Sequence, residues 1–302
     1  MATHSFQAPK GTRDFYPGDL AVRRHIENAW RSASIDCGFD EIEGPTFEHL
    51  ELFTAKSGEA IVNELFSFRR AGGENDYALR PEFTPTLARM VAARAGSLPV
   101  PVKWFAIPNM FRAERPQRGR LREFVQWNID ICGVEGAATD IDVISCAILA
   151  LERLGLTPKD VQVRLSHRVA IARMLGALGV SAEKSADAMT LLDRRDKLKP
   201  EEFAQRAEAL GLNADGVARF DTAARATQPL AETLTALAAK IGVSTDEFTA
   251  LDELRAAADA AGILEWCSVD IGIVRGLAYY TGTVFEFHEV SGAERAVAGG
   301  GR

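Results

Sequence analysis

The chain has 302 residues, enough for two domains of ~100–200 residues each, and its 35 Lys and Arg against 42 Asp and Glu give a net charge of −7. Hydrophobic residues make up 47% and charged residues 25%, the balance of a globular protein, which excludes a disordered or collagen-like chain. No apolar run approaches the ~20 residues of a membrane span, and the N-terminal segment lacks the apolar core of a signal peptide. We therefore expect a cytoplasmic protein with no membrane partner.

The cysteines are scattered along the chain and form no CxxC pair, so we expect reduced thiols and no bound metal: Cys37, Cys132, Cys146 and Cys267. The acidic total argues weakly against a dedicated nucleic-acid-binding protein. It does not exclude a local basic site, because phosphates respond to the potential within a Debye length.

The first part of the chain predicts helices and short strands. Apolar spacing near 3.6 residues predicts a helix over about residues 20–36, with Asp19 as its cap. Residues 39–53 predict a short strand broken at Gly44-Pro45, which should be kinked or lie at a sheet edge because proline has no backbone donor. Further along, turn signals and periodicity predict a hairpin, a helix, two strands and another helix, over residues 66–80, 84–95, 104–111, 122–132 and 139–154.

Residues 169–262 are rich in alanine, the strongest helix former, and Gly-Val and Gly-Leu pairs interrupt them. We interpret this segment as an α-helical insertion. β-favouring residues return at 268–275 and 282–290. The chain therefore predicts an α+β fold, a largely antiparallel sheet flanked by helices and interrupted by the insertion.

One loop is strongly basic despite the acidic total. Residues 103–124 hold six Lys or Arg and two Glu, and five arginines fall between positions 112 and 122. Arginine forks match phosphate and carboxylate oxygens bidentately, so a strand–loop–strand holding them could clamp a polyphosphate. On composition alone, a solvated charged loop explains the charges equally well.

Two further segments place polar groups where a ligand could bind. Glu82 and Thr84 stand between a strand and a helix, where they could bind an ammonium group or simply cap the helix. Gln126, Asn128 and Asp130 alternate along a strand and should share one face. Because buried polar groups without partners are costly, a ligand pocket explains these three better than a core does, and a solvent-facing strand is the alternative.

The C-terminal segments combine an arginine, tyrosines and glycines. Arg275 precedes Tyr279 and Tyr280 between two predicted strands, where Gly282 permits close backbone approach; a hairpin with an incidental arginine is the alternative. Residues 298–302, AGGGR, suit a tight turn or the approach of a phosphate. The sequence has no P-loop, dinucleotide-binding, zinc-protease or nucleophile-elbow motif.

Together these segments resemble the catalytic domain of the histidyl-tRNA synthetases, a family of class II aminoacyl-tRNA synthetases. KGTRDFYP resembles the family's opening, GFDEIEGPTFEHLELF motif 1, and FRAERPQRGRLREFVQWNID motif 2. RGLAYYTGTVFEF resembles the histidine-specific signature, and AVAGGGR the approach to motif 3. The resemblance covers nearly the whole chain, and motif 2 together with the histidine signature is far more specific than either alone.

The resemblance implies that histidine and ATP, accompanied by Mg²⁺, form histidyl-adenylate and pyrophosphate, and that histidine then passes to the 3′ end of tRNA(His). Both reactants of the first step are anionic, so positioning and charge neutralisation should dominate catalysis. The implied catalytic residues are Arg112 and Arg275, both at the α-phosphate. The implied ATP contacts are Arg112, Glu114, Arg120 and Arg275. The implied histidine contacts are Glu82, Phe83, Thr84, Gln126, Asp130, Tyr279 and Tyr280, with Asp130 and Tyr280 at the imidazole.

The resemblance also implies a domain organisation. Residues 1–168 and 263–302 would form the two parts of the catalytic core, around the insertion at 169–262. The chain ends within motif 3 and lacks the C-terminal anticodon-binding domain, so we expect a fragment that is inactive or impaired alone. Motif 1 packs at a twofold interface in this family, which implies a homodimer.

A non-catalytic alternative is the synthetase-like regulatory subunit of ATP phosphoribosyltransferase. We expect such a protein to lose the arginine of the histidine signature, whereas Arg275 and Arg112 are both present here, which favours the synthetase. Ala278 departs from the acid that many members carry, between ligand-binding residues, and should have a small effect. A structural or RNA-binding module leaves the polar strand and the paired arginines unexplained.

Overall fold

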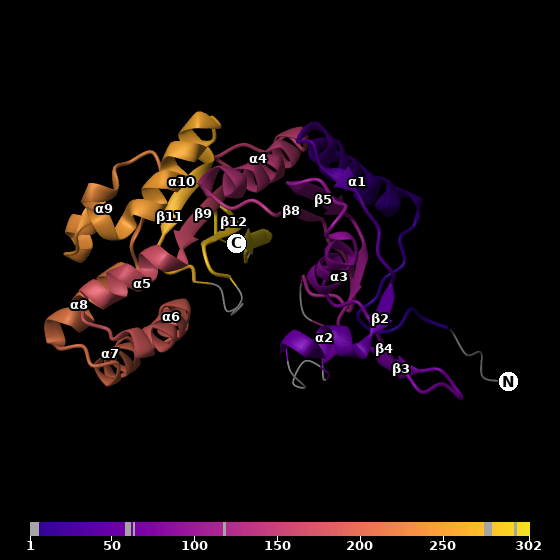
Figure 1. Cartoon of the computed structure of the whole chain (residues 1–302), viewed down its shortest axis with the longest axis horizontal. Coiled ribbons are helices and arrows are strands. Elements are labelled where there is room, and N and C mark those ends of the chain that lie inside the picture. The colour runs from indigo at the N-terminus through magenta and orange to yellow at the C-terminus, as the bar shows by residue number, and fades with distance from the viewer. Residues whose placement is uncertain (1–5, 58–61, 63, 117–118, 275–279, 293–294) are drawn as a thin grey trace. The chain divides into compact units, whose positions relative to one another are not determined.

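The computed structural model describes residues 6–57, 62, 64–116, 119–274, 280–292 and 295–302. The chain forms two compact units, Met1–Val134 and Glu135–Arg302, each with its own sheets and helices (Figure 1). Among the described residues, none of the helices has the length and apolar character needed to cross a membrane.

In its described residues, the first unit combines three small sheets with three α-helices. Its elements are α1 (Pro17–Asp36), β1 (Asp40–Glu41), β2 (Phe47–His49), α2 (Leu50–Ser57), β3 (Ser67–Arg69), β4 (Asp76–Leu79), α3 (Thr84–Arg94), β5 (Val102–Ala106), β6 (Asn109–Phe111), β7 (Glu123–Val125) and β8 (Asn128–Cys132). The described sheets have the orders β1-β5-β8, β2-β4-β3 and β6-β7. Within this unit, all described strand pairings are antiparallel except that of β1 with β5.

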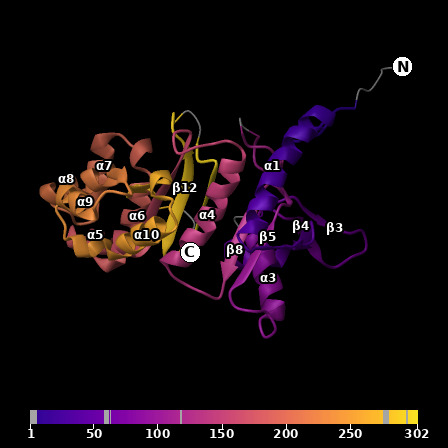
Figure 2. The ribbon, with the colours of Figure 1, turned by 90° about the horizontal axis from the view of Figure 1, so that it is seen from above.

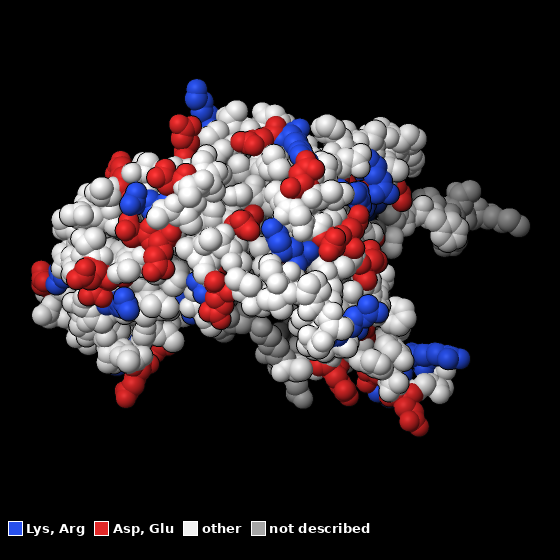
Figure 3. All heavy atoms as spheres, turned by 45° about the horizontal axis from the view of Figure 1, so that its top comes forward, with Lys and Arg blue, Asp and Glu red and all other residues white. Residues whose placement is uncertain are grey.

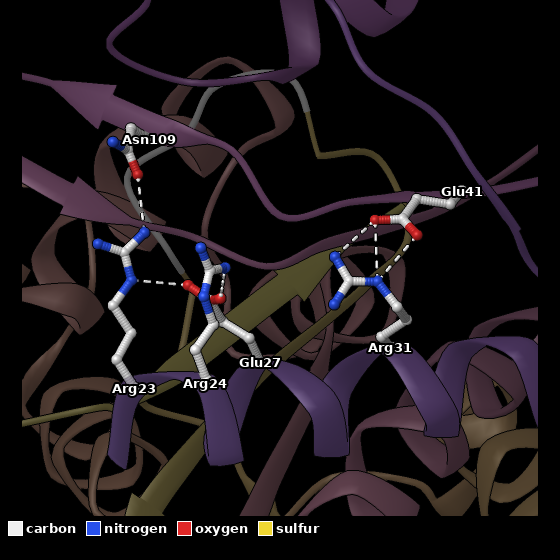
Figure 4. A network of polar contacts seen from close by, with 6 residues as sticks. All are labelled: Arg23, Arg24, Glu27, Arg31, Glu41 and Asn109. Atoms are coloured by element: carbon white, nitrogen blue, oxygen red, sulfur yellow. Dashed lines mark hydrogen bonds and ion pairs between the residues drawn. The ribbon is translucent and has the colours of Figure 1, made fainter. Parts of the chain in front are cut away.

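Helix α1 begins three residues earlier than predicted, because Pro17 occupies the first turn, where its missing N–H costs nothing. Asp19 lies in that first turn rather than at the cap, which is Tyr16. One ion pair and one hydrogen bond attach the helix to the sheets (Figure 4). Arg31 donates to both carboxylate oxygens of Glu41 at 2.8 and 2.9 Å, and Arg23 donates to Asn109 Oδ1 at 3.1 Å.

The predicted break at Gly44-Pro45 is confirmed: β1 and β2 lie on either side of it, and each is an edge strand. The continuation of that strand to residue 53 is wrong, because α2 begins at Leu50. The hairpin of β3 and β4 and helix α3 are confirmed.

The two long strands predicted over 104–111 and 122–132 are each divided in two. β5 pairs with β8, and β6 pairs with β7, across a break that falls at Pro108 in one segment and at Gln126 in the other. Pro108 has no N–H to continue the ladder, but its carbonyl accepts a hydrogen bond from the Gln126 amide at 3.1 Å.

The second unit is a five-stranded sheet with helices. Its elements are α4 (Ala137–Arg153), β9 (Val161–His167), α5 (Arg168–Ala177), α6 (Ser185–Asp193), α7 (Pro200–Ala209), α8 (Ala214–Ala224), β10 (Thr227–Pro229), α9 (Leu234–Ile241), α10 (Thr249–Ala260), β11 (Cys267–Asp270), β12 (Thr283–Glu289) and β13 (Ala298–Gly301), with short 3₁₀ turns between. The strand order is β10-β11-β9-β12-β13, and in both ribbon views α6 to α9 gather on one side of the sheet (Figures 1 and 2).

The helical segment predicted over 169–262 is helical from α5 to α10, but it also contains β10, which pairs with β11. It shares one hydrophobic core with the sheet and α4. That core includes Ile144, Ile148, Val163, Leu165, Ile171, Phe203, Phe220, Phe248 and Phe285. The boundary of an insertion at residue 169 stays a prediction.

The glycine run near residue 300 forms β13, an edge strand antiparallel to β12, so the predicted tight turn is wrong. The glycines make room for aromatic rings. A Cβ at Gly300 would lie 2.6 Å from the Phe285 ring, and one at Gly301 would lie 2.8 Å from the Tyr280 ring. Phe285 and Tyr280 are not near the glycines in the sequence, so the local pattern could not reveal these contacts.

Candidate active site

The segment that joins β4 to α3 is anchored by Arg80, whose side chain is 4% exposed. Its Nε donates to the Asn109 carbonyl at 2.9 Å, and its Nη1 donates to the Gly44 carbonyl at 2.8 Å and to Glu43 Oε1 at 2.9 Å. One buried guanidinium thus joins the Gly44-Pro45 turn to β6. Arg80 was not among the predicted site residues, because a buried arginine has no local signature beyond its place at the end of a strand.

Phe83 and its neighbours show how α3 begins. Phe83 is 1% exposed and packs in a small core with Leu87 and Met110, so its side chain serves the fold. It is also the N-cap residue of α3, and no side chain caps the helix from that position. Glu82 and Thr84, on either side, are half-buried.

Arg112 lies beside this segment. Its Nε donates to the Pro81 carbonyl at 3.1 Å, and its guanidinium stacks 5.0 Å from the centroid of the Phe124 ring. Both contacts fix the arginine without neutralising its charge. The structure therefore brings one predicted phosphate-binding residue next to the segment predicted to bind an ammonium group.

The loop after Arg112 carries a second pair of predicted residues. Arg120 Nη1 lies 3.3 Å from Glu114 Oε2, and both side chains are partly exposed. Arg115 is exposed. On the face drawn in Figure 3, basic and acidic side chains are interspersed, so that face carries no broad basic surface.

The polar strand differs from its prediction at one position. Gln126 lies in the break between β7 and β8, so only Asn128 and Asp130 are on the same strand, opposite Ala106 and Trp104. The reason is tertiary: Trp127 stacks on Trp30 of α1 at 5.8 Å and donates to Ser34 Oγ at 3.1 Å.

Asn128 and Asp130 are unusual for a strand inside a protein. Asn128 Oδ1 is buried and has no hydrogen-bond partner among the described residues. Burial raises the pKa of Asp130 to about 6, and burial together with the Asp130 charge raises the pKa of Cys132. Desolvated, under-bonded polar groups in a row are typical of a site that awaits a ligand.

In the second unit, Tyr280 lies against the backbone of Gly301, and the amides of Thr281 and Gly282 donate to the Arg302 carbonyl at 2.6 and 3.0 Å. The Arg302 side chain donates to Asp140, a buried residue of α4. Arg275 and Tyr279, and with them Ala278, lie outside the described residues.

Within the described ranges, no three or more His, Cys, Asp or Glu side chains are grouped so that they could hold a metal ion.

Comparison with known proteins gives a consistent result. The family model for histidyl-tRNA synthetase matches residues 11–302. The chain is similar to the histidine–tRNA ligase of Opitutus terrae, at 41% identity over 310 residues, 100% of this chain and 69% of that protein. It is also similar to the histidine–tRNA ligase of Natronomonas pharaonis, at 40% identity over 297 residues, 97% of this chain and 67% of that protein.

A solved structure from Bacillus halodurans, described as an ATP phosphoribosyltransferase regulatory subunit/histidyl-tRNA synthetase, has a similar fold. The TM-score is 0.80 at 25% identity, over 98% of this chain and 76% of that one.

Proposed function

This chain belongs to the histidyl-tRNA synthetase family, and we propose from that membership that it activates histidine with ATP and transfers it to tRNA(His). Its α+β fold is the class II fold predicted from the sequence. The observation that carries the proposal is the position of Arg112 beside the Pro81–Thr84 segment. A phosphate-binding cation and an ammonium-binding segment then serve two substrates that must react with each other.

The first step joins two anions. The histidine carboxylate attacks the α-phosphorus of ATP, the new P–O bond forms as the bond to the pyrophosphate oxygen breaks, and pyrophosphate leaves. Arg112 and Arg275 would neutralise charge at the α-phosphate, which is where fixed cations lower such a barrier most. Histidine then passes from the adenylate to the 3′ end of tRNA, and AMP leaves.

Asp130 explains how the site would select histidine. The desolvated carboxylate of Asp130 has no hydrogen-bond partner among the residues that the structure describes. It would accept an imidazole N–H, and it would stay unpaired with an apolar side chain of similar size. The proposal assigns Tyr280 and Tyr279 to the imidazole as well. Glu82, Thr84 and Gln126 would bind the ammonium group, with Phe83 as their buried support.

The ATP contacts in this proposal are Arg112, Glu114, Arg120 and Arg275. ATP would enter as its Mg²⁺ complex, with the metal ion as part of the substrate. The partly exposed ion pair of Glu114 with Arg120 supports their assignment as ATP contacts, because a weak surface ion pair can open for a nucleotide at little cost in free energy.

The alternative is a non-catalytic regulatory subunit, one of the two descriptions given to the Bacillus halodurans structure. Two features of the sequence favour the enzyme. Arg112 and Arg275 are both retained, and a protein without adenylation chemistry has no use for paired cations at the α-phosphate.

We further propose a cytoplasmic homodimer that pairs through the aromatic patch, defined as Phe47, His49, Phe68 and Tyr77 on one face of β2-β4-β3. Phe47 and Phe68 are 49% and 44% exposed, and their ring centroids are 5.8 Å apart. Clustered exposed rings on a motif 1 strand support a protein contact there. Residues 169–262 would form the insertion of the catalytic core.

The test is histidine-dependent ATP–pyrophosphate exchange, which needs no tRNA. Exchange is measured on this chain and on the longest natural form of the protein. We expect exchange with histidine alone among the amino acids, and its loss in Arg112→Ala. The matched control is Arg94→Ala, an exposed arginine in the last turn of α3, which should leave exchange unchanged. Folded protein without histidine-dependent exchange in either form would favour the regulatory subunit.

A further inference from the structure

We propose that the turn Pro9–Thr12 is a positioning element of the ATP-binding loop, and that Arg122 is the positioning residue that joins the two. The inference rests on the proposed function, since it concerns the loop that holds Arg112, Glu114 and Arg120. Neither the turn nor Arg122 was among the predicted site residues.

Arg122 is bonded to the turn and to the loop at the same time. Its amide donates to the Gly11 carbonyl at 2.7 Å, and its Nη1 donates to the Lys10 carbonyl at 3.3 Å. On the loop side, its Nε donates to the Glu114 carbonyl at 3.2 Å, and its own carbonyl accepts from the Arg112 amide at 2.9 Å. The backbone of two proposed ATP contacts is therefore held by this one residue.

Gly11 shows how closely the turn is seated. Its φ of +92° lies in the region that favours glycine. A Cβ there would lie 2.8 Å from Arg122 Cγ and 2.8 Å from Pro116 Cγ, so the bare backbone packs directly on both side chains. The turn itself is closed by Thr12, whose amide and Oγ1 donate to the Pro9 carbonyl at 3.0 and 2.8 Å.

These contacts give Arg122 a different role from its neighbours on the loop. Its guanidinium donates one hydrogen bond to a carbonyl of the loop and one to a carbonyl of the turn. Hydrogen bonds from a charged donor are among the stronger ones. Arg122 thus holds the loop backbone while Arg112 and Arg120 serve the nucleotide. Fixing that backbone before ATP arrives lowers the ordering cost of binding.

The experiment compares Michaelis constants in the exchange assay, on whichever form of the wild-type protein exchanges. Arg122→Gln should raise KM for ATP about tenfold, because charge-assisted hydrogen bonds to the loop are lost, and should leave KM for histidine unchanged. Gly11→Ala should also raise KM for ATP, because the added Cβ would push the turn away from Arg122. In the double variant, KM for ATP should be no higher than in the single variant with the higher KM, because both substitutions break the same contact.

Lys10→Ala is the matched control. Lys10 contributes only its backbone carbonyl to Arg122, so removing its exposed side chain should leave both constants unchanged. Arg122→Lys should recover part of the loss, because one ammonium can still reach a carbonyl.

Thermal melts of each variant separate positioning from folding. If Arg122→Gln does not fold, Gly11→Ala and Arg122→Lys decide the question. The inference is overturned if KM for ATP stays at the wild-type value, if both Michaelis constants rise together, or if the two single effects add in the double variant. Absence of exchange in the wild type would instead overturn the proposed function.

Discussion

Replacement of Arg80 by methionine should destabilise the first unit strongly. Methionine fills much of the same volume, but it leaves the carbonyls of Gly44 and Asn109 without the donors that now satisfy them. A buried acceptor left unpaired costs about 1–3 kcal/mol. Glu43 is largely exposed, so water can solvate its carboxylate once Arg80 is gone. Its lost ion pair therefore adds little to the loss of stability. The two carbonyls together predict a loss of roughly 2–6 kcal/mol, a large share of the ~5–15 kcal/mol by which folded domains are usually stable.

The measurement is urea unfolding followed by tryptophan fluorescence, since the Trp30–Trp127 stack lies in the same unit. The midpoint should fall while the slope m stays constant. The control is Arg69→Met: Arg69 makes two hydrogen bonds to Asp76 across the β3–β4 hairpin, but both side chains are exposed, so the midpoint should hardly move. Equal shifts in the two variants would refute the reasoning, because burial of the acceptors would then be irrelevant.

Three further predictions follow from the structure. Phe47→Asp should convert the proposed dimer to monomers in sedimentation velocity, since it places a charge within the aromatic patch; an unchanged sedimentation coefficient counts against that surface. Because the pKa of Asp130 is raised from 3.8 to about 6, the stability that Asp130 itself contributes should be full below pH 4 and fall by roughly 3 kcal/mol as pH rises through 6, and Asp130→Asn should remove this component in urea titrations. Burial lowers the pKa of His167, whose Nδ1 accepts from the Val169 amide at the start of α5, so stability should be lost as pH falls through that lowered value. His167→Asn keeps the acceptor, and a persistent acid-side loss in that variant would contradict this role for His167.

Elements defined by neighbours in the sequence were predictable. The β3–β4 hairpin follows from a polar glycine turn between β-favouring runs, and α3 follows from Pro85 at its first turn. In the candidate site, Glu114 and Arg120 belong to one continuous motif and do lie together, while their binding of ATP stays a prediction.

Features defined by distant partners were not predictable. The break at Gln126 depends on Pro108 across the strand pair and on Trp30 from α1, neither of which is near it in the sequence. Gly300 and Gly301 suit a turn until the rings above them are known. Arg80 and Arg122 were missed for the same reason. The local sequence does not distinguish an arginine that donates to backbone carbonyls from an arginine exposed to solvent.

The place of β9 in its sheet has a consequence for synthesis on the ribosome. β9 lies between β11 and β12, and both of those strands come after the whole α5–α10 segment. A nascent chain that has emerged only as far as α10 therefore holds β9 with both edges open and with Val163 and Leu165 uncovered by their strand neighbours. The strand partners within the first unit have all emerged by then. Premature termination inside α10 thus yields a finished first unit joined to an aggregation-prone second one.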